Sequence, residues 1–379
     1  MERIYDVIVV GAGPAGATLS RHLAASGIKV LVLDRAVFPR HKCCGGGLTV
    51  RAASLLGDEC AAIVENSISS AVLAFGGSHS AHGEYDRTVM YTLSREKFDN
   101  FLVQKAEESG ATILQNAAAN GLTTSDTRVE VFTDSGTFQS KFVVGADGAG
   151  SVVAGSLFPD ARSRVVAIET EVGVSESDLA KWQKRVKVDF GCVSEGYGWL
   201  FPKADHLSIG VASLKVKAAD LKRSYWQFVR SLDLDRCDIR RWSGGIIPIC
   251  NSMPVVTEGR VALIGDAAGL ADPLTGEGIY NAILSARLAA SAIGNSLARG
   301  EPNLQAYQHS VEEMILPEIR AARFFARLRR VPKRLLDFAR ADDRIWRAAG
   351  SLLRGETTYA SIRDRVGSLG GLHSLLKQR

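Results

Sequence analysis

Residues 4–34, IYDVIVVGAGPAGATLSRHLAASGIKVLVLD, decide the fold of this chain. The apolar run from Ile4 to Val10 predicts a buried strand, and the segment from Thr18 to Ser26 predicts a helix that Gly27 ends. The run from Lys29 to Leu33 predicts a second strand. A strand, a glycine-rich turn, a helix and a strand in this order are typical of the βαβ unit of a Rossmann-like α/β domain.

Three glycines, Gly11, Gly13 and Gly16, stand between the first strand and the helix with the spacing GxGxxG. In such a turn the first glycine allows the tight bend, the second lets a pyrophosphate approach the backbone, and the third lets the helix pack on the strand. Asp34 closes the second strand, where a carboxylate accepts hydrogen bonds from an adenosine ribose and repels a 2′-phosphate. The unit therefore predicts binding of FAD or NAD rather than NADP.

The composition is ordinary for a globular protein of two domains, or of one large domain with an insertion. The chain has 379 residues, of which 46% are hydrophobic and 23% are charged. No stretch reaches the roughly 18 apolar residues of a membrane span, and the first apolar run is too short for a signal peptide. The six cysteines form neither CxxC nor zinc-like spacings, so we expect free thiols, no metal site and a cytoplasmic protein.

The net charge of +5 is unevenly distributed. Residues 318–379 hold 15 Lys and Arg against 6 Asp and Glu, within a basic region, 301–379, that we expect to be mostly helical. Basic helices with an apolar face can lie on anionic membranes, and the same pattern also fits a helical cap packed on its own domain. No nucleic-acid partner is expected, because no finger, helix-turn-helix or RNP motif accompanies the charge.

Two further glycine and aspartate signatures follow predicted strands. In FVVGADGAGSVVA, residues 142–154, the strand leads into Asp147 and Gly148. In RVALIGDAAGLADPLTGEGIYNAILSARLAA, residues 260–290, the strand ends at Asp266 and a long helix follows Gly278.

The three signatures in this order resemble the FAD-binding fold shared by aromatic hydroxylases, flavin halogenases and geranylgeranyl reductases. The resemblance implies that Asp266 contacts the ribityl and pyrophosphate part of FAD and that Asp147 lies near the middle of the cofactor. It also implies that the helix after Gly278 directs its N-terminus at the flavin N1–C2=O edge, where its dipole stabilises the anionic reduced flavin. Arg95 matches an arginine at the start of another helix of this domain. Many hydroxylases carry an arginine where this chain has Ala154, and this difference weakens the hydroxylase interpretation.

Two further motifs point to one branch of that fold. Residues 39–46, PRHKCCGG, resemble the PxxKxCGG pattern of the geranylgeranyl reductase family. Residues 197–202, YGWLFP, resemble its YxWxFP motif, whereas the related halogenase motif ends in Ile-Pro. The resemblance implies that the first loop lies against the isoalloxazine ring with Cys44 on the substrate side. It places the aromatic strand over the flavin, in a second domain.

The resemblance implies an FAD-dependent oxidoreductase that saturates isolated C=C bonds of a prenyl (geranylgeranyl-type) chain by hydride transfer from reduced flavin. The expected substrate is a prenyl lipid or prenyl diphosphate, and the electron donor is NADPH or reduced ferredoxin. Cys44, Tyr197 and Trp199 are the catalytic candidates, with Cys44, Tyr197 or a water as the proton donor. Trp199 and Phe201 are expected to line the substrate cavity.

The expected fold class is α/β, with a Rossmann-like FAD-binding domain, an antiparallel-sheet substrate domain and a helical C-terminal region. We expect the FAD domain to be discontinuous, over residues 1–75, 95–165 and 255–300, and the substrate domain to cover residues 76–94 and 166–254. The residues expected to contact FAD are Gly11, Gly13, Ala15, Gly16, Asp34, Arg35, Lys42, Cys44, Gly45, Gly47, Arg95, Ala119, Asp147, Gly148, Asp266, Gly276, Gly278 and Ile279.

Two other functions stay open at this point. The fold also permits a flavin-dependent monooxygenase or halogenase of an aromatic substrate. A flavin-binding protein without turnover, acting as a membrane-associated sensor or chaperone, is the third possibility. Oxygen consumption with an aromatic substrate would identify the second function, and lack of any turnover would favour the third.

Overall fold

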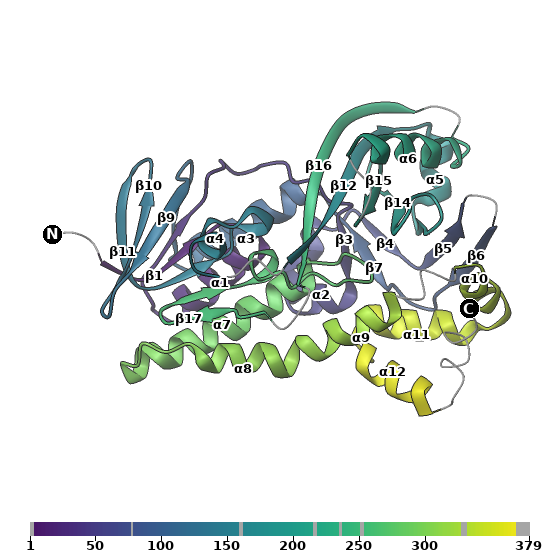
Figure 1. Ribbon diagram of the computed structural model, residues 1–379. Coiled ribbons are helices and arrows are strands. Elements are labelled where there is room, and N and C mark those ends of the chain that lie inside the picture. Colours follow the sequence, from purple (N-terminus) through teal and green to yellow (C-terminus); the bar gives the residue numbers. More distant parts are fainter. Residues whose placement is uncertain are drawn as a thin grey trace. The chain divides into compact units, whose positions relative to one another are not determined.

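The computed structural model describes residues 4–76, 79–158, 162–214, 218–234, 237–250, 254–326 and 332–368 (Figure 1). The chain divides into two compact units, and its course crosses from one to the other several times. Unit 1 comprises Met1–Lys42, Ser94–Val165 and Ile246–Leu316, and unit 2 comprises Cys43–Leu93, Val166–Gly245 and Pro317–Arg379.

The core of unit 1 is a sheet in which five neighbouring strands run parallel, in the order β18-β11-β1-β2-β8. Val9 of β1 pairs with Val32 of β2 on one side and with Val144 of β11 on the other, and all three side chains are buried. Strands buried on both faces read as continuous apolar runs, which is the pattern that the sequence shows here. The strands are β1 (Ile4–Val10), β2 (Val30–Leu33), β8 (Thr112–Leu114), β11 (Gly136–Gly145) and β18 (Val261–Leu263).

Helices cover this parallel sheet, and an antiparallel extension lengthens it. Helix α1 (Pro14–Ala25) packs against α3 (Arg95–Glu108) and α7 (Ile279–Arg299), and it begins four residues before the expected Thr18 because Pro14 suits the first helical turn. Strands β9 (Ala119–Thr124) and β10 (Val129–Thr133) form the antiparallel extension on β11. Shorter elements complete unit 1: α4 (Val152–Leu157), β17 (Thr257–Glu258) and α8 (Gln305–Met314).

Unit 2 is built on a seven-stranded sheet in the order β16-β12-β15-β14-β13-β5-β6. The predicted antiparallel sheet is confirmed for the pairs β12–β15, β15–β14, β14–β13 and β5–β6. The pair β13–β5 is parallel and departs from it, because β5 comes from a segment far earlier in the chain. The strands are β5 (Ser70–Phe75), β6 (His79–Glu84), β12 (Arg162–Gly173), β13 (Arg185–Asp189), β14 (Gly196–Pro202), β15 (Leu207–Ser213) and β16 (Asp238–Cys250).

One face of this sheet is covered by α6 (Ala218–Arg230), whose Tyr225 and Phe228 are fully buried against Leu200 and Ile209. A small sheet in the order β3-β7-β4 and three short helical segments lie in the same unit. Their bounds are β3 (Gly47–Thr49), α2 (Val50–Ser54), η1 (Asp58–Ile63), β4 (Asn66–Ile68), β7 (Met90–Thr92) and α5 (Glu176–Trp182).

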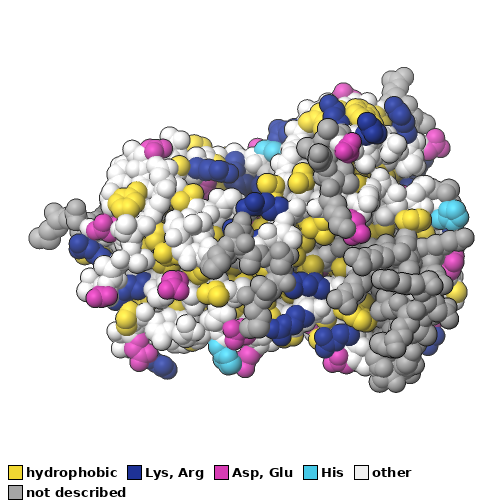
Figure 2. All heavy atoms as spheres, in the orientation of Figure 1, with side chains coloured by type: hydrophobic (Ala, Val, Ile, Leu, Met, Phe, Trp, Pro, Cys, Tyr) yellow, Lys and Arg dark blue, Asp and Glu magenta, His cyan; other side chains and the backbone are white. Residues whose placement is uncertain are grey.

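The C-terminal helices pack on unit 2 through their apolar residues. Trp346 is buried with Leu336 and Ala339 against Ala81 of β6, and its indole Nε1 donates to the Ala339 carbonyl at 2.8 Å. Lys and Arg side chains that can be seen in Figure 2 are scattered rather than gathered into one patch. None of the helices in the described ranges has the length and apolarity to cross a membrane. The helices are α9 (Leu316–Ala326), α10 (Pro332–Ala341), α11 (Asp343–Arg354) and α12 (Tyr359–Ser368); residues 369–379 of the basic region lie outside the described residues.

The unit boundaries differ from the expected domain boundaries in several segments. Residues 43–75, which we expected in the FAD domain, belong to unit 2, because β5 pairs with β13. Residues 246–254, expected in the substrate domain, belong to unit 1. The C-terminal helical region, residues 301–379, divides between the units at residue 316.

Candidate functional site

The glycine turn after β1 in unit 1 is shaped by close backbone contacts. A Cβ atom on Gly11, whose φ is +102°, would lie 2.5 Å from the Ala146 carbonyl oxygen, and one on Gly16 would lie 1.8 Å from the Gly11 oxygen. Among the described residues, a Cβ on Gly13 would meet only the Arg40 guanidinium, at 3.7 Å. Gly11 and Gly16 are thus required by packing. Gly13 instead leaves the backbone open at the start of α1, where a helix can bind a phosphate; Ala15 is buried in the first turn of that helix.

Asp34 ties the end of β2 to the glycine turn. Its Oδ2 accepts a hydrogen bond from the Ala12 amide at 2.7 Å, and its Oδ1 accepts one from the Ala36 amide at 2.8 Å. The sequence predicts a ribose contact and not this structural role. The two are compatible, because each carboxylate oxygen can accept a second hydrogen bond. Arg35 beside it is exposed, and Ala119, the first residue of β9, is partly buried.

An arginine pair in unit 1 shares one buried carboxylate. Arg95 donates from Nε and Nη2 to the two carboxylate oxygens of Asp99 at 2.8 and 2.9 Å, and the Arg40 Nη2 lies 3.1 Å from Asp99 Oδ2. Asp99 is completely buried. Within the described part of the chain, the buried Arg40 Nη1 has no hydrogen-bond partner. Two guanidinium groups on one carboxylate leave a positive site, which suits a diphosphate.

Neither Arg40 nor Asp99 was predicted. The signals available were the arginine inside PRHK and the i, i+4 spacing of Arg95 and Asp99 on a helix.

Asp147 and Asp266 of the later signatures are partly buried in unit 1. Asp147 Oδ2 accepts from the Val152 amide at 2.7 Å, whereas its buried Oδ1 has no partner among the described residues. Burial raises the pKa of Asp147, and hydrogen bonds to Ser151 and nearby amides oppose that rise. Asp266 keeps some accessible surface, yet surrounding protein raises its pKa too, against the charges of Lys42 and Arg95.

A sharp turn leads from Asp266 to helix α7. Gly276 has φ +73°, and Gly278 is the N-cap, where a Cβ would lie 3.0 Å from Asp266 Oδ1. No side chain caps this 21-residue helix at its start, and Ile279 is buried in its first turn. The first-turn amides and the positive end of the α7 dipole therefore point toward the space in front of the N-cap, Gly278. Gly148 has φ +76° and open space at its Cβ position.

These residues fit a dinucleotide cofactor. The unpartnered Asp147 Oδ1 and Arg40 Nη1 supply buried hydrogen-bonding capacity of opposite charge, which a bound polar group would satisfy. The open backbone at Gly13 supplies the phosphate contact. The individual contacts to FAD that the sequence predicts remain predictions.

In unit 2 the cysteine loop and the aromatic strand come together. Trp199 is buried on the same face of β14 as Tyr197, and their ring centroids lie 6.1 Å apart. A Cβ on Gly45 would lie 2.8 Å from Trp199 Nε1 and 3.0 Å from Phe201, and one on Gly47 would lie 3.0 Å from Phe201. The glycines therefore let the loop backbone rest directly on the indole and phenyl rings. The two motifs that resemble geranylgeranyl reductases form one cluster.

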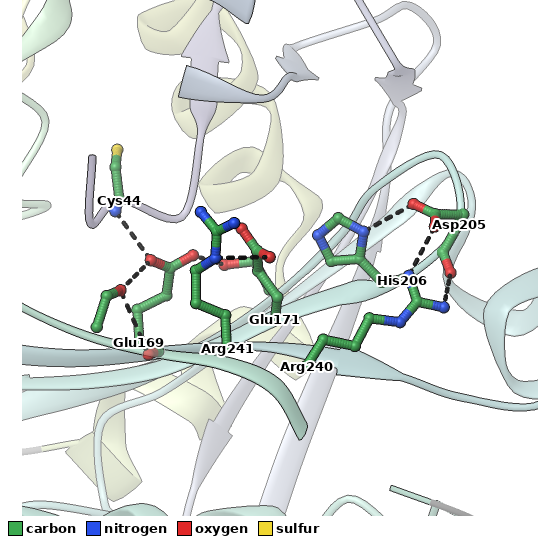
Figure 3. Close-up of polar contacts among 9 residues, drawn as sticks. Cys44, Glu169, Glu171, Asp205, His206, Arg240 and Arg241 are labelled. Carbon is green, nitrogen blue, oxygen red and sulfur yellow. Dashed lines mark hydrogen bonds and ion pairs between the residues drawn. The ribbon is translucent and has the colours of Figure 1, made fainter. Parts of the chain in front are cut away.

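Cys44 lies in this cluster with its thiol free. Its Sγ accepts a hydrogen bond from the Gly46 amide at 3.3 Å, and its own amide donates to Glu169 Oε2 at 3.1 Å (Figure 3). Cys43 is not in a disulfide either and packs against β16, where a Cβ on Gly245 would lie 3.2 Å from its Sγ. The geometry thus separates a packing thiol from one at the aromatic surface. Lys42, the last residue of unit 1, is partly buried.

The comparisons with known proteins decide the family. A family model described as an FAD binding domain matches residues 4–207. An uncharacterised protein of Methanosarcina barkeri is 32% identical over 326 residues, 85% of this chain and 83% of that protein. A geranylgeranyl diphosphate reductase of Rhodobacter capsulatus is 31% identical over 307 residues, 79% of this chain and 77% of the relative. The chain belongs to the geranylgeranyl reductase family. It is therefore an FAD-dependent oxidoreductase, as its motifs predict.

Solved structures agree on the fold of this geranylgeranyl reductase family member. A geranylgeranyl bacteriochlorophyll reductase-like protein from Thermoplasma acidophilum superposes with a TM-score of 0.83 at 22% identity, over 97% of this chain and 100% of that one. The halogenase PltM is more distant, with a TM-score of 0.69 over 84% of this chain and 74% of its own. The predicted fold class is confirmed, and the halogenase alternative rests on a weaker likeness.

Proposed function

We propose that this protein reduces isolated C=C bonds of a prenyl chain, carried by a prenyl lipid or a prenyl diphosphate. The observation that carries the proposal is the cluster in unit 2, where the Cys44 loop lies on Trp199 and Phe201. An apolar surface of this kind suits a hydrocarbon chain, which offers no group for hydrogen bonding. The diphosphate reductase named above acts on such a chain and supports this assignment.

The residues of unit 1 would hold FAD, which when reduced supplies the hydride for one alkene carbon. Gly13 and the start of α1 would bind the pyrophosphate, together with the guanidinium groups of Arg40 and Arg95 that share the Asp99 carboxylate. Asp34 would bind the ribose. The electrons that restore reduced flavin come from NADPH or reduced ferredoxin. Only one dinucleotide turn of the GxGxxG type occurs in the sequence, so we propose that the donor binds transiently.

The residues of unit 2 would bind and protonate the alkene. Trp199 and Phe201 contact the prenyl chain and exclude water from it, because an apolar wall leaves no partner for water. The second alkene carbon needs a proton, which we assign to the thiol of Cys44, with Tyr197 as the other candidate. The Gly46 amide that donates to Cys44 Sγ would then stabilise the negative charge left on sulfur. Hydride and proton together convert the double bond to a single bond.

Access to a lipid substrate requires contact with a membrane surface. We propose that exposed cations of the C-terminal helices, such as Arg344 with 79% of its side chain exposed, provide this contact for a cytoplasmic, peripheral protein. The apolar side chains of α10 and α11 that pack on β6 are not available for it. Flotation with anionic vesicles tests this, and equal binding to neutral vesicles would contradict it.

The function is tested by anaerobic turnover. Dithionite-reduced protein is mixed with geranylgeranyl diphosphate, a digeranylgeranyl glycerophospholipid or a menaquinone, and flavin absorbance is followed while products are weighed by mass spectrometry. We expect at least one compound to reoxidise the flavin and to gain hydrogen. Failure of every prenyl compound, with hydroxylation or halogenation of an aromatic compound in air, would replace this proposal by the monooxygenase alternative. Lipids that copurify with the protein would identify the natural chain.

A further inference from the structure

A buried carboxylate in unit 2 gathers three elements around the Cys44 loop. Glu169 of β12 is 3% exposed, and it accepts hydrogen bonds from the Cys44 amide at 3.1 Å, from Ser208 Oγ at 2.9 Å and from Ser243 Oγ at 3.0 Å (Figure 3). Ser208 Oγ in turn accepts from the Trp199 indole Nε1 at 3.4 Å. One side chain is therefore linked to both the thiol loop and the aromatic wall.

A buried ammonium holds the other side of the same loop. Lys203 is 4% exposed, and its Nζ donates to the Gly45 carbonyl at 2.8 Å and to the Leu93 carbonyl at 2.6 Å. Gly46 follows with φ +69°, and a Cβ there would lie 2.2 Å from both Lys203 Nζ and the Leu93 oxygen. Burial lowers the pKa of Lys203, and the negative charges around it, including Glu169, oppose that shift.

Neither charge is explained by stability. Removing two ions from water costs several kcal/mol each, and apolar residues of similar volume often replace buried charges without loss. The contacts are also long-range, since Glu169 is 125 residues from Cys44 and Lys203 is 158 residues from Gly45. Each charged side chain forms a hydrogen bond with a backbone group of the Cys44 loop. Such contacts fix the position of a loop.

We propose that Glu169 and Lys203 form a charge clamp that fixes the two-residue segment Cys44–Gly45, and with it the Cys44 thiol and the Trp199 indole, at the reacting double bond. They are positioning residues, because they contact the loop and not the reacting atoms. This inference deepens the proposed reductase function and rests on it. The Glu169 carboxylate accepts a hydrogen bond from the Cys44 N–H, and the Lys203 ammonium donates one to the Gly45 C=O. The two charges therefore hold neighbouring groups of one short segment.

A first test is independent of any substrate. Amide hydrogen exchange of the segment 43–47 is compared between the wild type and Glu169→Gln, with Glu171→Gln as the control. Glu171 lies on the same strand, and its carboxylate is 3.7 Å from Arg241. We expect the Cys44 amide to exchange roughly tenfold faster in the Glu169 variant, since a hydrogen bond to a charged group is lost. The control leaves this exchange unchanged. Equal protection in all three proteins overturns the clamp.

A second test separates positioning from stability. Glu169→Gln and Lys203→Met each remove one of two buried, interacting charges of opposite sign, so both are expected to lower the melting temperature. The double variant removes both charges, and its melting temperature should recover. Prenyl turnover should not recover: we expect kcat to stay down by about 10²-fold, with KM and FAD content near wild type. Recovery of kcat together with stability would show a purely structural role and would overturn the inference.

The two tests also separate the inference from the proposed function. If the wild type reduces no prenyl compound, the reductase proposal fails, whereas the exchange experiment still decides whether the clamp holds the loop. If the wild type is active and Glu169→Gln exchanges and turns over like the wild type, the clamp fails and the reductase proposal stands.

Discussion

Two glycine-containing loops of this protein reach their shape in different ways. The loop Gly11–Gly16 in unit 1 is fixed by its own backbone and by the adjoining strand and helix, through contacts such as Gly16 with the Gly11 carbonyl. The loop Cys43–Gly47 in unit 2 is fixed by side chains distant in the sequence, chiefly Glu169 and Lys203. The first loop is a general binding device for phosphates. The second packs on one aromatic surface, and we propose that it determines the chemistry of this protein.

The largest expected effect comes from adding a side chain at Gly16 in the first loop. A valine in place of Gly16 puts Cβ where the Gly11 oxygen lies, so the βαβ unit cannot form as it is. We expect destabilisation of more than about 4 kcal/mol, beyond the range of most point changes, and loss of bound FAD. Thermal unfolding and flavin absorbance measure both. Gly155→Ala is the control, because no atom of the described residues lies within 4 Å of its Cβ position. A similar loss of stability in that variant would contradict the packing argument.

The next effect concerns the thiol of the second loop. Cys44→Ala removes the proposed proton donor, and loss of a general acid lowers kcat by roughly 10²-fold or more. FAD content should remain that of the wild type, because the proposed FAD-binding residues of unit 1 are unchanged. Cys43→Ala is the matched control, with turnover within about twofold of wild type. Equal turnover of the two variants would move the proton donor to Tyr197 or to water.

A smaller effect is expected from crowding the second loop. A Cβ on Gly45 meets Trp199 Nε1 at 2.8 Å, and the loop must shift by a few tenths of an ångström to accept Gly45→Ala. We expect kcat to fall about tenfold at unchanged FAD content, since small displacements of reacting groups reduce rate strongly. Gly244→Ala in β16 is the control, where the nearest atom is 3.8 Å away. A Gly45→Ala enzyme as fast as this control would show that the loop is not held tightly.

The smallest effect is a pH dependence in unit 1. Burial raises the pKa of Asp266, so its ionisation disfavours the folded apoprotein as pH rises from the unfolded value of 3.8 through the folded value. Asp266→Asn should therefore raise the melting temperature of the apoprotein at pH 7 by roughly 2 °C, and the difference should vanish below the unfolded pKa. FAD affinity should fall at the same time. Exposed Asp126→Asn serves as the control; a variant less stable than wild type at pH 7 contradicts this account.

The contrast between the loops also explains what the sequence could predict. The βαβ unit, the Asp147 and Asp266 turns and the start of α7 depend on local spacing, and the structure has them where the pattern predicts them. The pairing of β5 with β13 was missed, because strand neighbours from distant segments leave no local signal. Glu169 was missed for a similar reason. An acidic residue in a strand gives no indication of the amide that it binds 125 residues earlier.

The central claim is that the Cys44 loop on Trp199 forms the surface at which a prenyl double bond is reduced. Its most direct test is anaerobic mixing of the dithionite-reduced wild type with geranylgeranyl diphosphate, beside the Cys44→Ala protein at equal FAD content. We predict that the wild type reoxidises its flavin and yields hydrogenated product, and that the variant does so at least about 10²-fold more slowly. Reoxidation of the flavin at equal rates in both proteins, or an unchanged prenyl chain after wild-type turnover, would contradict the claim.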